Sequence, residues 1–359
     1  MSGLLDLPNE LLLAVANNLR RGYRDLKSLT LSCSKFCPIS QEVLHVEVTI
    51  RRATSLRGPS NVTYLARTLI QRPDLALKVR KLHLGIIGNP IMHSSSCLHL
   101  MHVEEQGCTC GLKKLLSLCT KALHTTSTNN GLSLYNFDWV ANIHDGFQLA
   151  IVGLILCITP NLESLVLNYH KQKLNHLGFY TTPVGFEHIS FDDLFGNATA
   201  FAGFPIEHIK GFTKLTRLST NTFPPSKMLW LPQLKVLELG LLDNHCDQVP
   251  NYIRPSFNPT NTTLTTALTH LAVRLDKLAL YSDKVIWMEG MYGHLRNTIK
   301  SLTALVHLSL RFESGWGNGF NHNLGDLGEA SYEYVASALQ SLSLTHLVLD
   351  IEAVSYTHL

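Results

Sequence analysis

One short apolar pattern returns along most of this chain and constrains its fold more than any other feature. The pattern is an apolar residue, two others, a leucine, one other and a last apolar residue. Its copies begin at Val79, Leu162, Leu215, Leu234, Leu268, Leu305 and Leu344. Alternate residues of a strand face the same side, so the last two apolar positions of each copy enter one core together. The pattern therefore predicts a series of half-buried strands.

Two of these copies are irregular. The copy that begins at Leu215 ends in Thr220, a polar residue, where the others end in an apolar one. Between Leu268 and Leu280 two registers overlap, one starting at Leu268 and the other at Leu275. Only one of the two registers can be the strand, and the spacing leaves both open.

Helix-like stretches precede several of the predicted strands, at residues 148–157, 291–301 and 331–342. A repeated order of helix, short turn and strand predicts an α/β fold with a parallel sheet and helices on its convex side. The body resembles the leucine-rich-repeat family, in an irregular form. The asparagine that usually follows the strand in that family is missing, because Asn168 and Asn221 fall at another offset. An ordinary leucine-rich α/β domain is the alternative.

The first 50 residues have a different character. Pro8 can open a helix, and Glu10 follows near the positive end of its dipole. Asp25 can cap a second helix, Pro38 can start a third, and a strand then ends at Ile50. The apolar residues of the first helix recur at helical spacing at Leu11, Leu12, Val15, Ala16 and Leu19. Three helices this short bury little surface, so they need a partner or the rest of the chain to cover them.

The N-terminal residues resemble the F-box, in the form found in fungal-type F-box proteins. The resemblance covers about residues 3–48. It rests on Leu7-Pro8-x-Glu10-Leu11-Leu12, on Asp25-Leu26-x-x-Leu29 and on Ser32-Cys33-Ser34-Lys35-Phe36. It implies a short three-helix module that docks on a Skp-family subunit through Leu7, Pro8, Glu10, Leu11, Leu26 and Leu29. The expected domains are residues 1–50, F-box-like, and 51–359, repeat-like, with a long irregular insertion at about 85–146.

The order of F-box and repeats implies a non-catalytic adaptor of an SCF-type cullin–RING ubiquitin ligase. The front would bind the Skp-family subunit and the repeats would bind a protein substrate. A second interpretation is an interaction scaffold without a ligase role, motivated by the basic residues from Arg20 to Arg24 and by Phe36, where many F-boxes have tryptophan. No glycine-flanked nucleophile, His-Glu-x-x-His or Gly-Lys-Ser/Thr motif occurs, and no cofactor is expected.

Composition narrows the class of partner and the compartment. The net charge of +3 is too small to predict nucleic-acid binding. The longest apolar run, Leu149 to Ile158, is far shorter than the roughly 20 residues of a membrane span. Eight cysteines without a secretory signal indicate reduced thiols, and so a cytoplasmic or nuclear protein.

One cluster has the side chains that bind zinc: Cys97, His99, His102, Cys108 and Cys110. Thiolates and imidazoles are preferred zinc ligands, and four of them complete a tetrahedron. The spacing differs from that of the common zinc fingers, and 18 histidines make chance proximity easy. A zinc-binding protein is therefore a third and weaker hypothesis.

Overall fold

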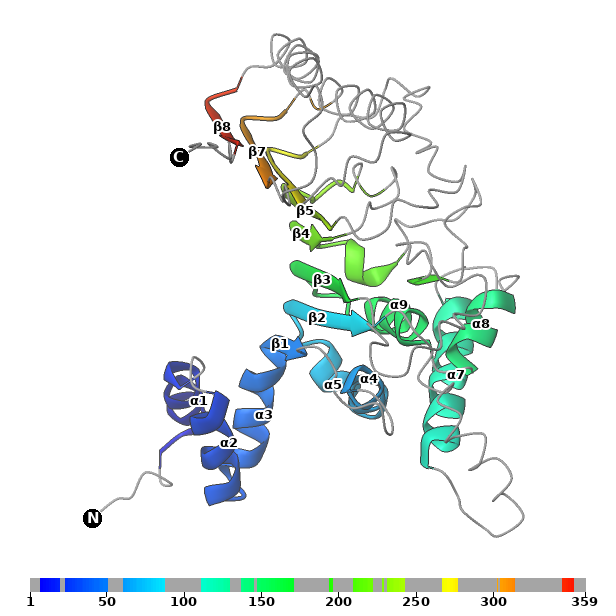
Figure 1. Ribbon diagram of the computed structural model, residues 1–359. Helices are drawn as coiled ribbons and strands as arrows, with labels where there is room; N and C mark the ends of the chain where they lie inside the picture. Colours follow the sequence, from blue (N-terminus) through cyan, green and yellow to red (C-terminus); the bar gives the residue numbers. More distant parts are fainter. Residues whose placement is uncertain are drawn as a thin grey trace, which may run out of the picture. The chain divides into compact units, whose positions relative to one another are not determined.

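The computed structural model describes residues 7–19, 23–50, 61–87, 111–129, 137–144, 147–170, 194–195, 209–221, 228, 231–242, 267–276, 302, 304–313 and 344–351. The chain divides into two compact units, Met1–Leu215 and Thr216–Leu359. The domain boundary expected at residue 50 stays a prediction. Parallel strands and helices make the fold α/β (Figure 1).

The first unit contains most of the described helices. Its elements are α1 (Asn9–Asn18), α2 (Tyr23–Ser32), α3 (Phe36–Val46), β1 (Glu47–Ile50), α4 (Asn61–Gln71), α5 (Pro73–Ala76), β2 (Lys81–Ile87), α7 (Gly111–Asn129), α8 (Phe137–His144), α9 (Gln148–Ile158), β3 (Ser164–His170) and the 3-10 helix η6 (Lys210–Phe212). Within it, β1 pairs in parallel with β2, and β2 pairs in parallel with β3.

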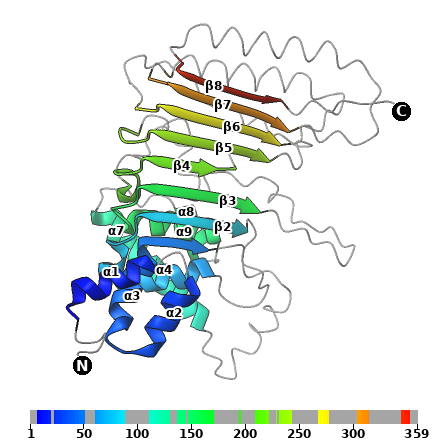
Figure 2. The same ribbon diagram turned by 90° about the vertical axis from the view of Figure 1, so that its left-hand side faces the viewer.

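The second unit is described through its strands, which lie side by side in chain order (Figure 2). They are β4 (Arg217–Thr220), β5 (Val236–Leu242), β6 (His270–Asp276), β7 (His307–Glu313) and β8 (His346–Ile351). Each pairs in parallel with the next. The helices expected at 291–301 and 331–342 lie outside the described residues.

All seven copies of the apolar pattern form strands, which confirms the prediction. The ambiguous stretch adopts the register that begins at Leu268, because β6 runs from His270 to Asp276 and both Leu268 and Leu271 are buried. In the irregular copy, Thr220 is buried at the position where the other copies have an apolar residue. An eighth strand, β1, follows the third helix where alternation to Ile50 had predicted it.

The strands of the first unit have one covered face and one open face. Leu82 and Leu84 are buried in β2, whereas Lys81 and His83 between them are exposed. Helix α9 packs behind β2, and α4 packs on α9 (Figures 1 and 2). Alternation in the sequence thus becomes an apolar face under helices and a polar face open to solvent.

A repeated hydrogen bond marks the entry to the strands. The carbonyl oxygen just before one strand accepts two N–H groups from the start of the next. Arg80, Thr216, Lys235, Thr269 and Val306 provide these carbonyls. In the first unit Asn161 adds a side-chain bridge, donating from Nδ2 to Leu77 O at 2.7 Å and accepting from Lys214 Nζ at 2.7 Å. These backbone hydrogen bonds therefore recur at the strand entries, although the asparagine that usually follows the strand in the leucine-rich-repeat family is missing.

The stretch at about 85–146, expected to have little periodicity, contains the helices α7 and α8, so that expectation was wrong there. Its being an insertion between repeats stays a prediction. The sequence does contain a weak helical pattern in α7, because Leu116, Cys119 and Leu123 follow one another at helical spacing and are buried. Ser and Thr residues near the end of α7 made this pattern hard to recognise. Residues 88–110 lie outside the described part.

Helix α9 is buried on every side from Gln148 to Cys157. Its neighbours approach so closely that a Cβ on Gly153 would lie 1.8 Å from the carbonyl oxygen of Leu194. Phe195, next in the chain, makes edge-on contacts with two rings, Trp139 at 5.4 Å and Phe212 at 6.1 Å between centroids. A continuous apolar run of this length therefore forms a core helix of the first unit. Among the helices described, none is both long and apolar enough to cross a membrane.

The three N-terminal helices exist as predicted, with two boundaries displaced. Helix α2 begins at Tyr23, so Asp25 lies in its first turn and is not its cap. Helix α3 begins at Phe36, two residues before Pro38, and the Phe36 N–H donates to Cys33 O. Proline is tolerated in a first turn because its missing N–H would have no helical partner there.

Candidate functional site

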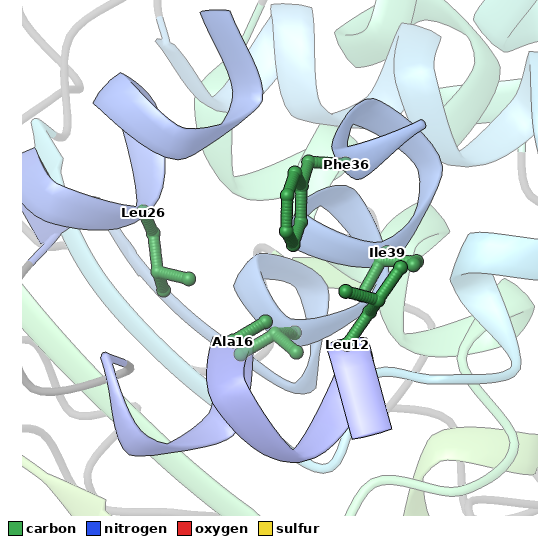
Figure 3. Packing of buried hydrophobic residues seen from close by; sticks show 6 residues of the cluster. Leu12, Ala16, Leu26, Phe36 and Ile39 are labelled. Carbon is green, nitrogen blue, oxygen red and sulfur yellow. The ribbon is translucent and has the colours of Figure 1, made fainter. Parts of the chain in front are cut away.

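Helices α1, α2 and α3 enclose a small apolar core of their own (Figure 3). Its buried members are Leu12, Ala16, Leu26, Phe36, Ile39 and Val43. Phe36 is almost fully buried between residues of the other two helices. The module is therefore held together by side chains from all three helices.

The six residues expected to dock on a partner divide into three groups. Pro8, Glu10 and Leu11 are exposed on the first turn of α1 or just before it, and 51% of Leu11 is accessible to solvent. Leu7 and Leu29 are half-buried against the core. Leu26 is 1% exposed, so its side chain serves the core and is not available to a partner.

The exposed side of α1 carries a narrow apolar ridge. Pro8, Leu11 and Val15 are spaced by three and four residues, so they share one stripe of the helix. Val15 is half-buried, while Pro8 and Leu11 are exposed. The stripe lies next to the row of Leu12 and Ala16 that enters the core. We name Pro8, Leu11 and Val15 the α1 ridge.

Local hydrogen bonds fix the start of the α1 ridge. The backbone N–H groups of Leu11 and Leu12 each donate to Pro8 O at 3.1 Å. Lys35 Nζ donates to Leu7 O at 3.1 Å, which ties the segment before α1 to the turn between α2 and α3. Glu10, in the first turn of α1, places a carboxylate at the positive end of the helix dipole beside the ridge. The ridge is thus a positioned apolar surface with an acidic residue at its edge.

Helix α3 connects the module to the rest of the first unit. It packs against α5 and β1, and Lys78 Nζ forms an ion pair with Glu42 on α3. The ridge on α1 remains accessible in this arrangement, because Leu11 keeps half of its surface. The rest of the first unit therefore does not seal the N-terminal module.

Sequence reasoning missed one exposed leucine on α2. Leu31 is 77% exposed and lies off the apolar side formed by Leu26, Leu29 and Cys33. Leu31 could have been recognised in the sequence as a leucine that does not fit the apolar spacing of its helix. A single exposed leucine is common on protein surfaces and carries no assignment by itself.

It also missed a row of histidines on the second unit. His270, His307 and His346 each begin a strand and are paired in register across β6, β7 and β8. The neighbouring rings are 5.3 Å and 5.7 Å apart between centroids. The recurring dipeptide His-Leu at the third position of three copies of the pattern was the available signal.

The zinc candidates Cys97, His99, His102, Cys108 and Cys110 all lie outside the described residues. Within the described ranges no group of three or more His, Cys, Asp or Glu side chains could hold a metal ion. Burial raises the pKa of the Cys119 thiol to about 11 and that of the Cys157 thiol to about 12. These two thiols are therefore protonated at neutral pH, and neither is an activated nucleophile.

No protein-family model, curated protein or solved structure matches this chain.

Proposed function

We propose that this chain is a non-catalytic substrate-recognition adaptor of an SCF-type cullin–RING ubiquitin ligase in the cytoplasm or nucleus. The N-terminal module would be an F-box that binds a Skp-family subunit, and the strands beyond it would be an irregular leucine-rich-repeat solenoid that binds a protein substrate. The adaptor would act by proximity, raising the effective concentration of substrate near a ubiquitin-loaded enzyme.

One observation carries the proposal: a three-helix module with its own core leaves the α1 ridge accessible, at residues that resemble the F-box. The module is followed by the parallel strands β1, β2 and β3, and the leucines of the repeated pattern are buried in β2 and β3. Small modules of this kind gain stability when a partner covers their apolar residues. A Skp-family subunit is the partner that the resemblance implies.

Leu11 offers a clean test, because it is exposed and Leu26 is not. Complete burial of a leucine contributes about 1.5–3 kcal/mol, so covering the accessible half of Leu11 contributes about 1 kcal/mol. Leu11→Asp removes this contribution and adds a carboxylate that the partner must desolvate. Affinity for the Skp-family subunit should therefore fall by about tenfold or more. Leu26→Ala would instead create a cavity in the core and confuse loss of binding with loss of folding.

The chain provides a matched control. Leu77, at the end of α5, is 52% exposed, almost the same as Leu11, and lies outside α1–α3. Purified full-length chain and its two variants would be titrated with the Skp-family subunit. Tight binding by wild type and Leu77→Asp, with weak binding by Leu11→Asp, supports the proposal. Equal binding by the wild type and both variants, or none by a folded wild type, contradicts it.

The scaffold interpretation remains as the alternative and predicts the last of these outcomes. Half-exposed Leu11 would then cover a surface of some other partner. The zinc hypothesis concerns residues outside the described part, and metal analysis of the purified chain tests it. Less than one equivalent of zinc per chain would remove it.

A further inference from the structure

A row of leucines runs across the strands of the second unit and ends at β8 in an exposed member. Leu237, Leu271, Leu308 and Leu347 are paired in register from β5 to β8. The first three are almost fully buried, whereas Leu347 is 45% exposed. Each of the first three lies on a strand that has a neighbour on both sides, but no described strand lies beyond β8 (Figure 2). Leu347 is therefore a core position of the repeat with a strand on one side only.

The opposite face of β8 is apolar at the same place. Val348 is also 45% exposed, and by strand alternation its side chain lies on the face opposite Leu347. Among the described side chains from Thr345 to Val348 there is no Lys, Arg, Asp or Glu. Edge strands of natural proteins are commonly short or carry charged residues, which discourage pairing with another chain. This part of β8 has exposed apolar side chains on both faces and no such charge.

The strand β1 of the first unit shows the contrast. It is four residues long and pairs with β2. Its exposed Glu47 forms an ion pair with Lys81 on β2, with 3.7 Å between Oε2 and Nζ. A short strand with a charged side chain is a poor template for a further strand. The edge of β8 is longer and neutral over its described side chains, so it is the better template.

The backbone of β8 can accept a further strand at Leu347. The N–H of His346 donates to Val306 O at 3.1 Å, which directs the backbone groups of His346 toward β7. Successive residues of a strand direct these groups to alternate sides, so the N–H and C=O of Leu347 point away from β7. A strand placed along this edge would pair with Leu347 and cover the side chains of Leu347 and Val348 together.

We propose that the outer edge of β8 binds β8 of a second copy of this chain, in a closed two-fold dimer. The described edge offers no charge that would select an acidic or basic peptide, and its complement is another neutral apolar strand edge. The second copy presents the same exposed leucine and valine. In an antiparallel pair about a two-fold axis perpendicular to the sheet, Leu347 lies opposite its counterpart, and the two exchange backbone hydrogen bonds. Both leucines then continue the buried row.

The size of the contact sets its strength. Two strands of six residues cover much less than the roughly 1,200–2,000 Å² of a stable interface. The dimer is therefore weak, with a dissociation constant of about 10–100 μM, and dilution separates it into single chains. The association needs no Skp-family subunit, so it goes beyond the proposed function and does not depend on it.

Sedimentation equilibrium of the full-length chain tests the proposal, at concentrations from about 1 to about 300 μM. The mass of the wild type should rise from that of one chain to that of two. Leu347→Lys places an ammonium group at the centre of the pair, where it would have to be desolvated, so dimerisation should weaken at least about tenfold. Leu77→Lys changes a leucine of the first unit that is 52% exposed, and it should dimerise as the wild type does.

Hydrogen–deuterium exchange of the wild type gives a second measurement that needs no variant. Exchange over residues 344–351 should slow as the concentration rises, because the outward N–H groups of β8 become paired. Exchange over residues 8–19 should not change with concentration. This result stands even if Leu347→Lys misfolds.

Several outcomes would overturn the proposal. These are a single-chain mass throughout the concentration range, a mass that continues beyond two chains, dimerisation of Leu347→Lys as tight as that of the wild type, and loss of dimerisation in Leu77→Lys. Exchange over residues 344–351 that is independent of concentration would also overturn it. Leu11→Asp should dimerise normally, so failure of the Skp-family interaction and failure of the β8 pairing are separate results.

Discussion

Replacement of Gly153 by alanine tests the close packing of α9 in the first unit. The new Cβ would lie 1.8 Å from Leu194 O, 2.8 Å from Leu194 C and 3.3 Å from Phe195 Cδ1. Two of these atoms belong to the backbone, so no side-chain rotation relieves the clash. Helix α9 and the segment at Leu194 must move apart by more than an ångström, because the distance from the new Cβ to Leu194 O is shorter than an ordinary van der Waals contact by about that much.

The expected magnitude follows from opposing effects. Alanine gains about 1 kcal/mol over glycine in a helix interior. Overpacking costs about 1–3 kcal/mol or more. Displacement of Phe195 also weakens its edge-on contacts with Trp139 and Phe212, each worth about 0.5–1.5 kcal/mol. The unfolding free energy should therefore fall by about 2–3 kcal/mol.

Urea denaturation followed by circular dichroism measures the effect, with Gly240→Ala as the matched control. Around Gly240, on β5, the nearest atom to a new Cβ is Asn221 Cβ at 3.9 Å, an ordinary contact. The control should stay within about 0.5 kcal/mol of wild type. A Gly153→Ala variant as stable as wild type would refute the packing of Leu194 against α9.

Further predictions concern buried polar groups. Ser40 Oγ is buried with no hydrogen-bond partner among the described residues, so Ser40→Ala should stabilise the chain by up to about 1 kcal/mol in the same denaturation assay. The control Ser32→Ala, at an exposed hydroxyl, should change the unfolding free energy little. A loss of more than about 1 kcal/mol in Ser40→Ala would contradict the prediction, because it would mean that the hydroxyl has a hydrogen-bond partner. Cys119 and Cys157 should resist iodoacetamide at pH 8 in the native chain, because burial keeps both protonated to about pH 11 and 12; mass-spectrometric labelling of either at the rate of an unfolded thiol would contradict this. Since unfolded thiols lose their protons near the reference pKa of 9.0, the same raised pKa values predict that the unfolding free energy declines as pH rises above about 9, and a flat profile up to pH 11 would oppose it.

The strands could be predicted because the alternation of apolar and polar residues that marks them lies within a few neighbouring residues. Leu82 and Leu84 flank His83, and Leu237 and Leu239 flank Glu238; that alternation decides both the strand and its buried face. The choice of register after Leu268 was not local. It depends on pairing of β6 with β5 and β7, which one repeat copy does not specify.

The helices were less predictable where polar residues hid their spacing. In α7 the buried positions include Cys119. A free cysteine packs in a core as a small apolar residue, but in a sequence it is more readily taken for a reactive one. In the N-terminal module, the resemblance to the F-box grouped Leu11 with Leu26. Packing of all three helices was needed to show that Leu26 faces inward while Leu11 stays accessible.

The row formed by His270, His307 and His346 could not be predicted from the sequence for a third reason. These residues are about 40 apart along the chain, and their ring contacts arise only from the register of β6, β7 and β8. That register is not visible within a single repeat copy.

Hydrogen–deuterium exchange of the full-length chain, with and without a Skp-family subunit, tests the central claim most directly. That claim is that the α1 ridge is covered by another molecule. The account predicts slower exchange over residues 8–19 on addition of the subunit, with no change across β2 and β3. Unchanged exchange over residues 8–19 at saturating subunit would contradict it.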